Sequence, residues 1–430
     1  MIQNIIKKLY PFPYSICGKG NDEAIKVFKK YLNFKIHNFE SGKSLNGWTI
    51  PHSWSLKKGI IFNQNKKIIF NAKNKNFGVP VLSKTFKGKI LLKNLKKKIF
   101  YSKYKNFAPY NWTNLYRKNF IDWGFCMNKN ELSKIKEKFY FIDLITKIKK
   151  SKMKVLEYTL KGRNKETIII NAHNCHPYQA NDDISGCAVG IQLFKNLRKI
   201  KNRKFTYKLV IAPEILGPLF WLKKIGNKKK HLKYCILLKS IGNNSNLKLQ
   251  HSSDPNSQID IVGLEELKKL NFNFKKGNFR EIYGNDEIVF DAPGYGIKTI
   301  SLTRFPFKEY HTDGDTPERI SEKKLQDVLK LLQNIINNFE QQTRYKCNFD
   351  GVISLSNKKF DLYKRAEAPG IDKHKYSKHL KKWNLLMNNL PNLLNNFYSV
   401  EQIAKIYNLP TNEVFKYCLK WKNKNLLKIF

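Results

Sequence analysis

The sequence is poor in acidic residues, in paired cysteines and in long apolar runs. Only 33 Asp and Glu stand against 81 Lys and Arg, which gives a formal net charge of +48 over 430 residues. The seven cysteines are an odd, scattered set without a CxxC pair, which argues against a disulfide framework and for a reducing compartment. The N-terminal stretch has no signal-peptide pattern, and no apolar run approaches the roughly 18 residues that span a bilayer. We therefore expect a cytoplasmic protein without membrane insertion.

The excess of positive charge would suit a polyanionic partner such as nucleic acid, an anionic polysaccharide or a lipid surface. The basic residues are overwhelmingly lysines, however, and they accompany Asn and Ile through every segment, as coding bias would produce. Without a local basic patch, the charge does not indicate such a partner. The hydrophobic content of 41% is that of a globular protein with a real core.

The pattern of apolar residues divides the chain into five parts. Residues 1–46 begin with a helical pattern, and residues 47–166 carry short β-type runs broken by Asn, Gly and Pro, which indicates a separate β-rich domain. In residues 167–345 strand and helix patterns alternate, which predicts a mostly parallel sheet flanked by helices. Residues 346–374 have little periodicity and are predicted to be a connector. Residues 375–430 show a helix, a tight turn and a second helix, as in a helix-turn-helix or winged-helix unit.

One loop of the α/β part carries a dense set of polar side chains. The sequence NAHNCHPYQANDDISG, residues 171–186, follows a β-branched apolar run and precedes a helical pattern, so it lies at a strand-to-helix turn. In open α/β sheets, such turns at the carboxyl ends of strands collect ligands and catalytic groups. Asn, Asp and Pro are also the ordinary residues of a polar loop. The stretch alone leaves a metal site and a simple turn equally open.

Three further polar stretches follow predicted strands. Glu214 lies in IAPEILG, Asp286 and Glu287 lie in YGNDEIVF, and His311 lies in EYHTDGDTPERI. Each has an ordinary explanation when taken alone, since Glu214 could cap the following helix and a single histidine is more often a satisfied core or surface residue. A parallel sheet would nevertheless bring these strand ends to one edge. That convergence favours a functional site.

In order and context these motifs resemble those of the zinc-dependent aminopeptidase and glutaminyl cyclase family of exopeptidases. ANDDISG, PEILG and YHTDGDTPERI are similar to that family's AxDNxSG-like turn, EExG strand end and YHTxxDT loop. LYPFPYSICGKG, GWTIPHSW, WGFC and CHPYQANDDISG look closer still to a bacterial aminopeptidase-like subgroup associated with polysaccharide-biosynthesis clusters. The resemblance covers nearly the whole chain. It implies a zinc-exopeptidase-like α/β fold with an inserted β-rich domain and a C-terminal winged-helix-like domain.

The resemblance also implies roles for individual residues. Asp182 matches the family's metal-binding Asp, His311 its distal histidine ligand and Glu214 its general base. The remaining ligand is open, because His173 stands at the family's HxD histidine whereas His176 belongs to the subgroup's CHP motif; we favour His176. Imidazole and carboxylate suit Zn²⁺, which keeps one position for water and lowers the pKa of that water to about 7. Glu214 would take the proton of the water and deliver it to the leaving amine.

Departures from the family's two-metal pattern predict a single zinc ion. Ile215 and Lys239 stand where the family has a second Glu and an Asp for its second zinc, and neither an alkyl group nor an ammonium is a metal ligand. Cys175 stands where the Asp of HxD would be, which leaves the orientation of His173 open. We expect a mononuclear site in which the Lys239 ammonium replaces the second ion.

Three classes of function remain open. The first is a zinc-dependent aminopeptidase-like hydrolase that cleaves an amide bond near a free terminus of a peptide-like substrate, or in an aminoacylated sugar if the polysaccharide association holds. The second is a metal-binding regulator whose C-terminal winged helix binds nucleic acid. Lysines beside aromatic residues in 411–430 suit that role, but packing or homo-oligomerisation is the favoured role of this unit. The third is a scaffold without turnover, against which the retained Glu214 argues.

Overall fold

A mixed sheet of eight strands forms the centre of the computed structural model, which describes residues 1–117, 120–271, 273–364 and 378–430. The strand order is β1-β10-β12-β11-β13-β16-β14-β15. The four strands β12, β11, β13 and β16 run parallel, whereas β1, β10 and β14 lie antiparallel to their neighbours β10, β12 and β16. The strands are β1 (Lys35–Glu40), β10 (Lys152–Leu160), β11 (Thr167–His173), β12 (Thr206–Ala212), β13 (Leu232–Lys239), β14 (Leu247–Gln250), β15 (Phe274–Gly277) and β16 (Lys298–Thr303).

The sheet separates two hydrophobic cores, because successive side chains of a strand point to opposite faces. Ile168 and Ile170 of β11 belong to the larger core and Ile169 to the smaller one. In the described residues, no helix is both long and apolar enough to cross a membrane. The larger core is covered by α1 (Ile2–Leu9), α2 (Lys19–Tyr31), α6 (Ser185–Leu197), α8 (Gln258–Lys269) and α10 (Glu322–Gln341), and the smaller one by α7 (Leu216–Ile225) and α9 (Glu287–Phe290).

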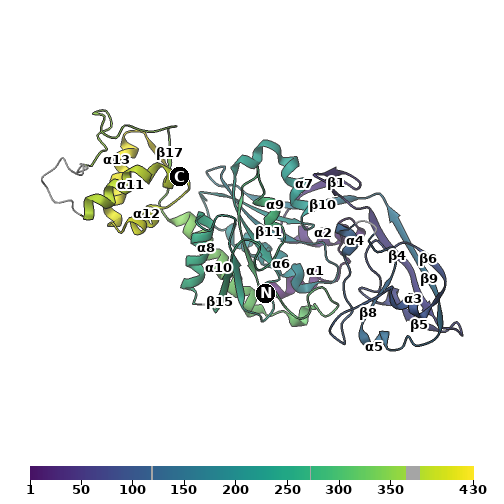
Figure 1. The fold of residues 1–430 in the computed structure, drawn as a ribbon. Coiled ribbons are helices and arrows are strands. Elements are labelled where there is room, and N and C mark those ends of the chain that lie inside the picture. Colours follow the sequence, from purple (N-terminus) through teal and green to yellow (C-terminus); the bar gives the residue numbers. More distant parts are fainter. Residues whose placement is uncertain (118–119, 272, 365–377) are drawn as a thin grey trace.

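A second β unit is inserted between β1 and β10 and lies at one end of the molecule (Figure 1). Its main sheet has the order β5-β4-β9-β6, and its own core includes Ile61, Phe125 and Tyr140. The strands of this sheet are β4 (Ser53–Phe62), β5 (Ile68–Asn71), β6 (Phe86–Leu91) and β9 (Phe139–Lys149), accompanied by β2 (Ser44–Leu45), β3 (Trp48–Thr49), β7 (Ile99–Tyr101), β8 (Phe125–Met127), α3 (Leu92–Lys96), α4 (Thr113–Tyr116) and α5 (Lys129–Leu132).

The end of this insertion differs from the boundary that the sequence pattern suggested at residue 166. Strand β10 pairs with β1 and β12 of the central sheet, so the chain has returned to the central domain at Lys152. Only Lys150 and Ser151 separate β9 from β10. Since the alternation of a strand looks the same in either sheet, no linker or change of pattern marks the crossing.

The last part of the chain forms a small helical unit with a core of its own. It contains α11 (Lys378–Asn395), α12 (Val400–Tyr407) and α13 (Thr411–Asn423), and β17 (Tyr345–Cys347) pairs antiparallel with β18 (Leu427–Ile429). The expected connector, residues 346–374, therefore begins within β17, and Leu362 is buried in the core of the helical unit. Residues 365–374 of that connector lie outside the described residues. The winged-helix assignment stays a prediction.

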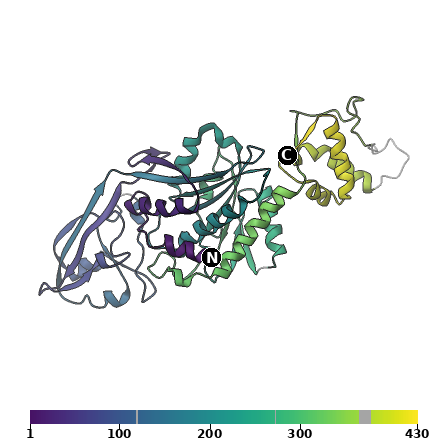
Figure 2. The same ribbon diagram turned by 180° about the vertical axis from the view of Figure 1, so that it is seen from behind.

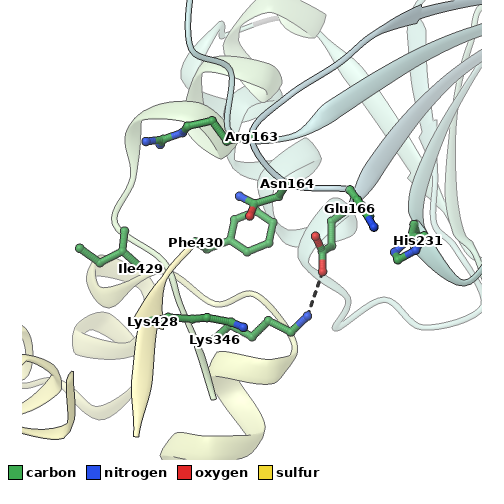
Figure 3. A pocket seen from close by; sticks show the side chains of 9 residues that line it. Arg163, Asn164, Glu166, His231, Lys346, Lys428, Ile429 and Phe430 are labelled. Atoms are coloured by element: carbon green, nitrogen blue, oxygen red, sulfur yellow. Dashed lines mark hydrogen bonds and ion pairs between the residues drawn. The ribbon is translucent and has the colours of Figure 1, made fainter. Parts of the chain in front are cut away.

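Aromatic side chains join this C-terminal unit to the central domain, at the end opposite the insertion (Figures 1 and 2). The ring centroid of Phe430 lies 4.5 Å from that of Phe205 in the central domain, and Phe397 contacts both rings. Beside this contact, Lys346 pairs with Glu166 across the junction at 2.9 Å (Figure 3). The C-terminal unit is thus docked on the central domain by buried apolar contacts.

Removing residues 376–430 should lower solubility or change the oligomeric state, because it uncovers the apolar face around Phe205. Size-exclusion chromatography of the shortened and full chains measures this effect, and an unchanged elution and solubility would contradict a packing role. In parallel, the full chain should bind duplex DNA weakly and with a steep dependence on salt, as nonspecific lysine contacts do. Tight, sequence-selective binding at physiological salt would instead favour a nucleic-acid role for this unit.

Candidate metal centre

The central sheet brings the predicted site residues to one edge, because parallel strands end on the same side. His173 is the last residue of β11, and the loop after it carries His176 and Asp182. Glu214 follows β12, and His311 lies in the loop after β16. Strand β13 ends at the same edge, and its last residue is Lys239.

His176, Asp182 and His311 converge, with one ligand atom of each lying within 4.8 Å of the others. Asp182 Oδ2 lies 3.5 Å from His176 Nδ1 and 3.0 Å from His311 Nε2. Two ligands of a tetrahedral zinc ion, with bonds of about 2.0–2.1 Å, lie about 3.3 Å apart. Both of these ring nitrogens are buried and lack a hydrogen-bond partner among the residues that the structure describes. Since buried polar atoms normally have partners, this donor set fits one zinc ion.

The protonation of the two histidines bears on metal binding, because only a neutral imidazole nitrogen can ligate. Burial lowers the pKa of His311 to about 4 against the opposing effect of Asp182, so its ring is neutral at pH 7. Burial also lowers the pKa of His176, but Cys175 and Asp182 outweigh it and hold that pKa well above its usual value. A metal ion must therefore displace a proton from His176, and binding should weaken as the pH falls.

Lys239 occupies the other side of Asp182. Its fully buried ammonium lies 2.7 Å from Asp182 Oδ1 and 2.8 Å from His173 Nε2. Burial disfavours the charge, but Asp182 and Glu214 more than compensate and raise the pKa of Lys239 above its usual value. His173 Nε2 itself lies 3.2 Å from Asp182 Oδ1. Burial and the Lys239 charge oppose protonation of His173, but Asp182 and Cys175 raise its pKa to about 10. The two oxygens of Asp182 thus face different groups: Oδ1 faces Lys239 and His173, and Oδ2 faces the two candidate ligands His176 and His311.

Glu214 lies beside the same histidine, with Oε2 3.4 Å from His176 Nε2. Its Oε1 accepts a hydrogen bond from Asn285 Nδ2 at 2.5 Å and a longer one from the Tyr283 hydroxyl at 3.4 Å. Burial would raise the pKa of Glu214, but Lys239 and the neighbouring histidines hold it below its usual value. The group is therefore a carboxylate at neutral pH, as a general base must be, and 12% of its side chain remains exposed to solvent.

Asp286 and Glu287, the acids of the YGNDEIVF stretch, are held by backbone N–H groups. Asp286 Oδ1 accepts from the N–H of Ile215 at 2.6 Å, and both oxygens of Glu287 accept from the N–H of Asn285 at 2.9 and 2.7 Å. Ile215 has a φ of 60°, which is strained for a β-branched residue. Asp286 thus holds the turn that carries Glu214. Glu287 holds the backbone of Asn285, whose side-chain amide in turn donates to Glu214.

The inserted unit reaches into the site through its Tyr110 segment. The Tyr110 ring lies 5.6 Å from each of the His176 and His311 rings, and its N–H donates to the His311 carbonyl at 2.8 Å. Trp112 lies 6.0 Å from the His311 ring and is 38% exposed. On its other side, Tyr310 stacks on His311 at 3.9 Å. Aromatic rings from both units therefore position the two candidate histidine ligands.

The sequence matches a family of known proteins. The family model of a domain of unknown function, DUF4910, matches residues 3–342. The chain belongs to the DUF4910 family. A Clostridium acetobutylicum protein named for polysaccharide biosynthesis and an aminopeptidase-like domain is 26% identical over 347 residues, which are 80% of this chain and 79% of that protein.

Two solved structures share the fold of this DUF4910 chain. One is a Clostridium acetobutylicum protein described as a peptidase, with a TM-score of 0.75 and 23% identity. The match covers 100% of this chain and 96% of that protein's chain. The other is the zinc aminopeptidase of Bacillus subtilis, with a TM-score of 0.58 and 14% identity. The match covers 79% of this chain and 94% of the aminopeptidase chain. The predicted family resemblance and the zinc-exopeptidase-like α/β fold are thereby confirmed.

The sequence patterns did not reveal the role of two acids, Asp315 and Asp183, that shape the loop of residues 171–186. Asp315 accepts from the N–H groups of Asn181 and Asp182 at 2.8 and 3.0 Å, and so holds the turn Ala180–Ile184. Asp183 accepts from the N–H of Gly186, where a Cβ would lie 2.6 Å from its carboxylate oxygens. Asp315 is the Asp of the YHTxxDT-like loop, but the motif does not reveal which N–H groups it accepts from. Tyr110 and Trp112 had no signal, since they are two of many aromatic residues in the insertion.

Proposed function

We propose that this DUF4910 protein is a mononuclear zinc hydrolase of aminopeptidase-like type, which cleaves an amide bond with Glu214 as general base. The observation that carries the proposal is the convergence of His176 Nδ1, Asp182 Oδ2 and His311 Nε2 around one point, with an ionised Glu214 beside it. A scaffold without turnover has no need of a base oriented in this way.

The chemistry divides between the ion and the side chains around it. Zinc held by His176, Asp182 and His311 would polarise a water molecule and lower its pKa to about 7. Glu214 accepts the proton of that water and later donates it to the leaving amine. Asn285 holds Oε1 of Glu214, and Oε2, which lies 3.4 Å from His176 Nε2, is the oxygen available for this transfer. Lys239 keeps Asp182 ionised and supplies positive charge where a second ion would otherwise lie.

The names of relatives support a substrate class. The Clostridium acetobutylicum relative carries polysaccharide biosynthesis and an aminopeptidase-like domain in its name. We extend this to a peptide-like or aminoacylated small substrate for the present chain. Elemental analysis of the purified protein, together with a screen of aminopeptidase and amidase substrates, tests the proposal, and a metal-loaded chain that cleaves none of them would contradict it.

His176→Ala should lose more bound zinc than His173→Ala. The reason is geometric, because His176 presents a buried and unpartnered Nδ1 to Asp182 Oδ2, whereas His173 Nε2 is already in contact with Lys239 and with Asp182 Oδ1. Zinc content per chain after exhaustive dialysis measures the difference, and circular dichroism controls for folding. The reverse ranking would move the ligand role to His173.

A further inference from the structure

A second set of ligand atoms lies at the other edge of the His176 ring. One atom each of His173, Cys175, His176 and Glu214 lies within 4.8 Å of the others. His176 directs Nδ1 towards Asp182 and Nε2 towards Glu214, so the two nitrogens of one ring serve different groups. We propose that the Nε2 edge is a second metal position, which takes a thiophilic divalent ion such as Cd²⁺, or Zn²⁺ in excess, through Cys175, His176 and Glu214.

Cys175 makes this position chemically different from the first. Its Sγ is buried, accepts the backbone N–H of Glu214 at 3.3 Å and lies 3.9 Å from His173 Nδ1. Thiolate, imidazole and carboxylate are all ligands of tetrahedral zinc, and sulfur favours softer ions over harder ones. The first position, by contrast, offers only nitrogen and oxygen. Soft ions should therefore discriminate between the two.

Lys239 bears on which residues bind the second ion and on which of the two metal positions fills first. Because the His173 ring is already held at Nε2 by Lys239 at 2.8 Å and by Asp182 at 3.2 Å, we assign the ion to the other three residues, with His173 as a further group in reach. The Lys239 ammonium also repels any additional cation nearby, and the shared His176 ring must give up its second proton before it can bind two ions. This position should fill after the first one.

Occupation of the second position should inhibit the enzyme. An ion bound to Glu214 takes the carboxylate that would otherwise accept the proton of the attacking water. This consequence rests on the proposed function, whereas the position itself rests only on the four side chains. The second metal position and the proposed hydrolase function can therefore be tested independently of each other.

Cobalt(II) titration of the metal-free full-length chain tests the position, because a thiolate–cobalt bond gives a charge-transfer absorption in the near ultraviolet that nitrogen and oxygen ligands do not give. We expect no such band with the first equivalent and a growing band with further cobalt. Cys175→Ser should abolish the band and keep the first equivalent, and His311→Ala should weaken the first equivalent and keep the band. The matched control is Cys187→Ser, which changes a buried cysteine that contacts the His173 carbonyl but lies outside the group, and this variant should keep the band.

A chain that shows no thiolate band at any cobalt ratio, or a band that survives Cys175→Ser, would overturn the second position whether or not the chain has activity. A band without turnover on any substrate would support the position and contradict the proposed function. With an active enzyme, excess Cd²⁺ should inhibit the wild type and the Cys187→Ser variant, and should inhibit Cys175→Ser at least tenfold less strongly.

Discussion

Glutamine in place of Glu214 should leave bound zinc near the wild-type level and lower turnover by about 10² to 10⁴, the usual contribution of a positioned general base. The amide has the size of the carboxylate but cannot accept a proton, and Glu214 is not one of the three proposed zinc ligands. Its contact with Asn285 involves a single oxygen, so the side chain can keep its place. Turnover at saturating substrate and zinc content per chain are the two quantities to measure.

Two results would contradict this role of Glu214. If the variant lost its zinc, Glu214 would be a ligand, and the base would have to be Asp286 or Glu287. If it kept full turnover, no base would act at this position. Glu266→Gln is the matched control, because it makes the same change in a buried carboxylate of α8 that contacts Asn338 and Lys269, and its turnover should stay near the wild-type level.

Alanine in place of Asp182 should remove zinc almost completely and should also destabilise the fold. The carboxylate lies between the two candidate histidine ligands and the buried Lys239. Breaking a buried ion pair by removing one partner costs about 3–5 kcal/mol, because the other charge is left unpaired. Zinc content and denaturant unfolding of the metal-free chain separate the two effects.

Two further variants distinguish zinc loss from unfolding. His311→Ala should lose zinc while the Asp182–Lys239 pair keeps the metal-free fold near wild-type stability. Asp182→Ala combined with Lys239→Met should recover stability but not zinc, since no unpaired charge remains. Wild-type zinc content in the single variants would contradict the site. Two tightly held ions in fully active wild-type protein would contradict its mononuclear character.

Much of the fold could be predicted because the chain's patterns are local. Strands buried on both faces are continuous apolar runs, and β11, β12, β13 and β16 all appear as such runs in the sequence. Parallel strands then require their loops to meet, which is why Asp182, Glu214 and His311 could be grouped before any geometry was known. The boundary before β10 could not be predicted, because it depends on which sheet a strand joins and not on its composition.

The site's surroundings were harder to predict for a related reason. Tyr110 contacts His311, although the two residues lie far apart in the sequence and no periodic pattern links them. Tyr110 also comes from the inserted unit, which has its own core. Cys175 was expected only to disturb a motif, whereas it lies with three other side chains of types that can bind a metal. Such contacts depend on tertiary packing, and a single sequence carries no record of them.

The buried Lys239 gives the centre a positive charge that is covalently part of the protein. A chelator can strip a metal ion from its ligands, and a competing metal can replace it, but neither can remove a side chain. Asp182 therefore keeps a counter-charge when the cell is short of zinc, and the empty enzyme should persist in a folded form that can be loaded later. If the chain binds one zinc ion, as we propose, it needs half as much zinc per molecule as a site for two ions, because Lys239 supplies the second positive charge.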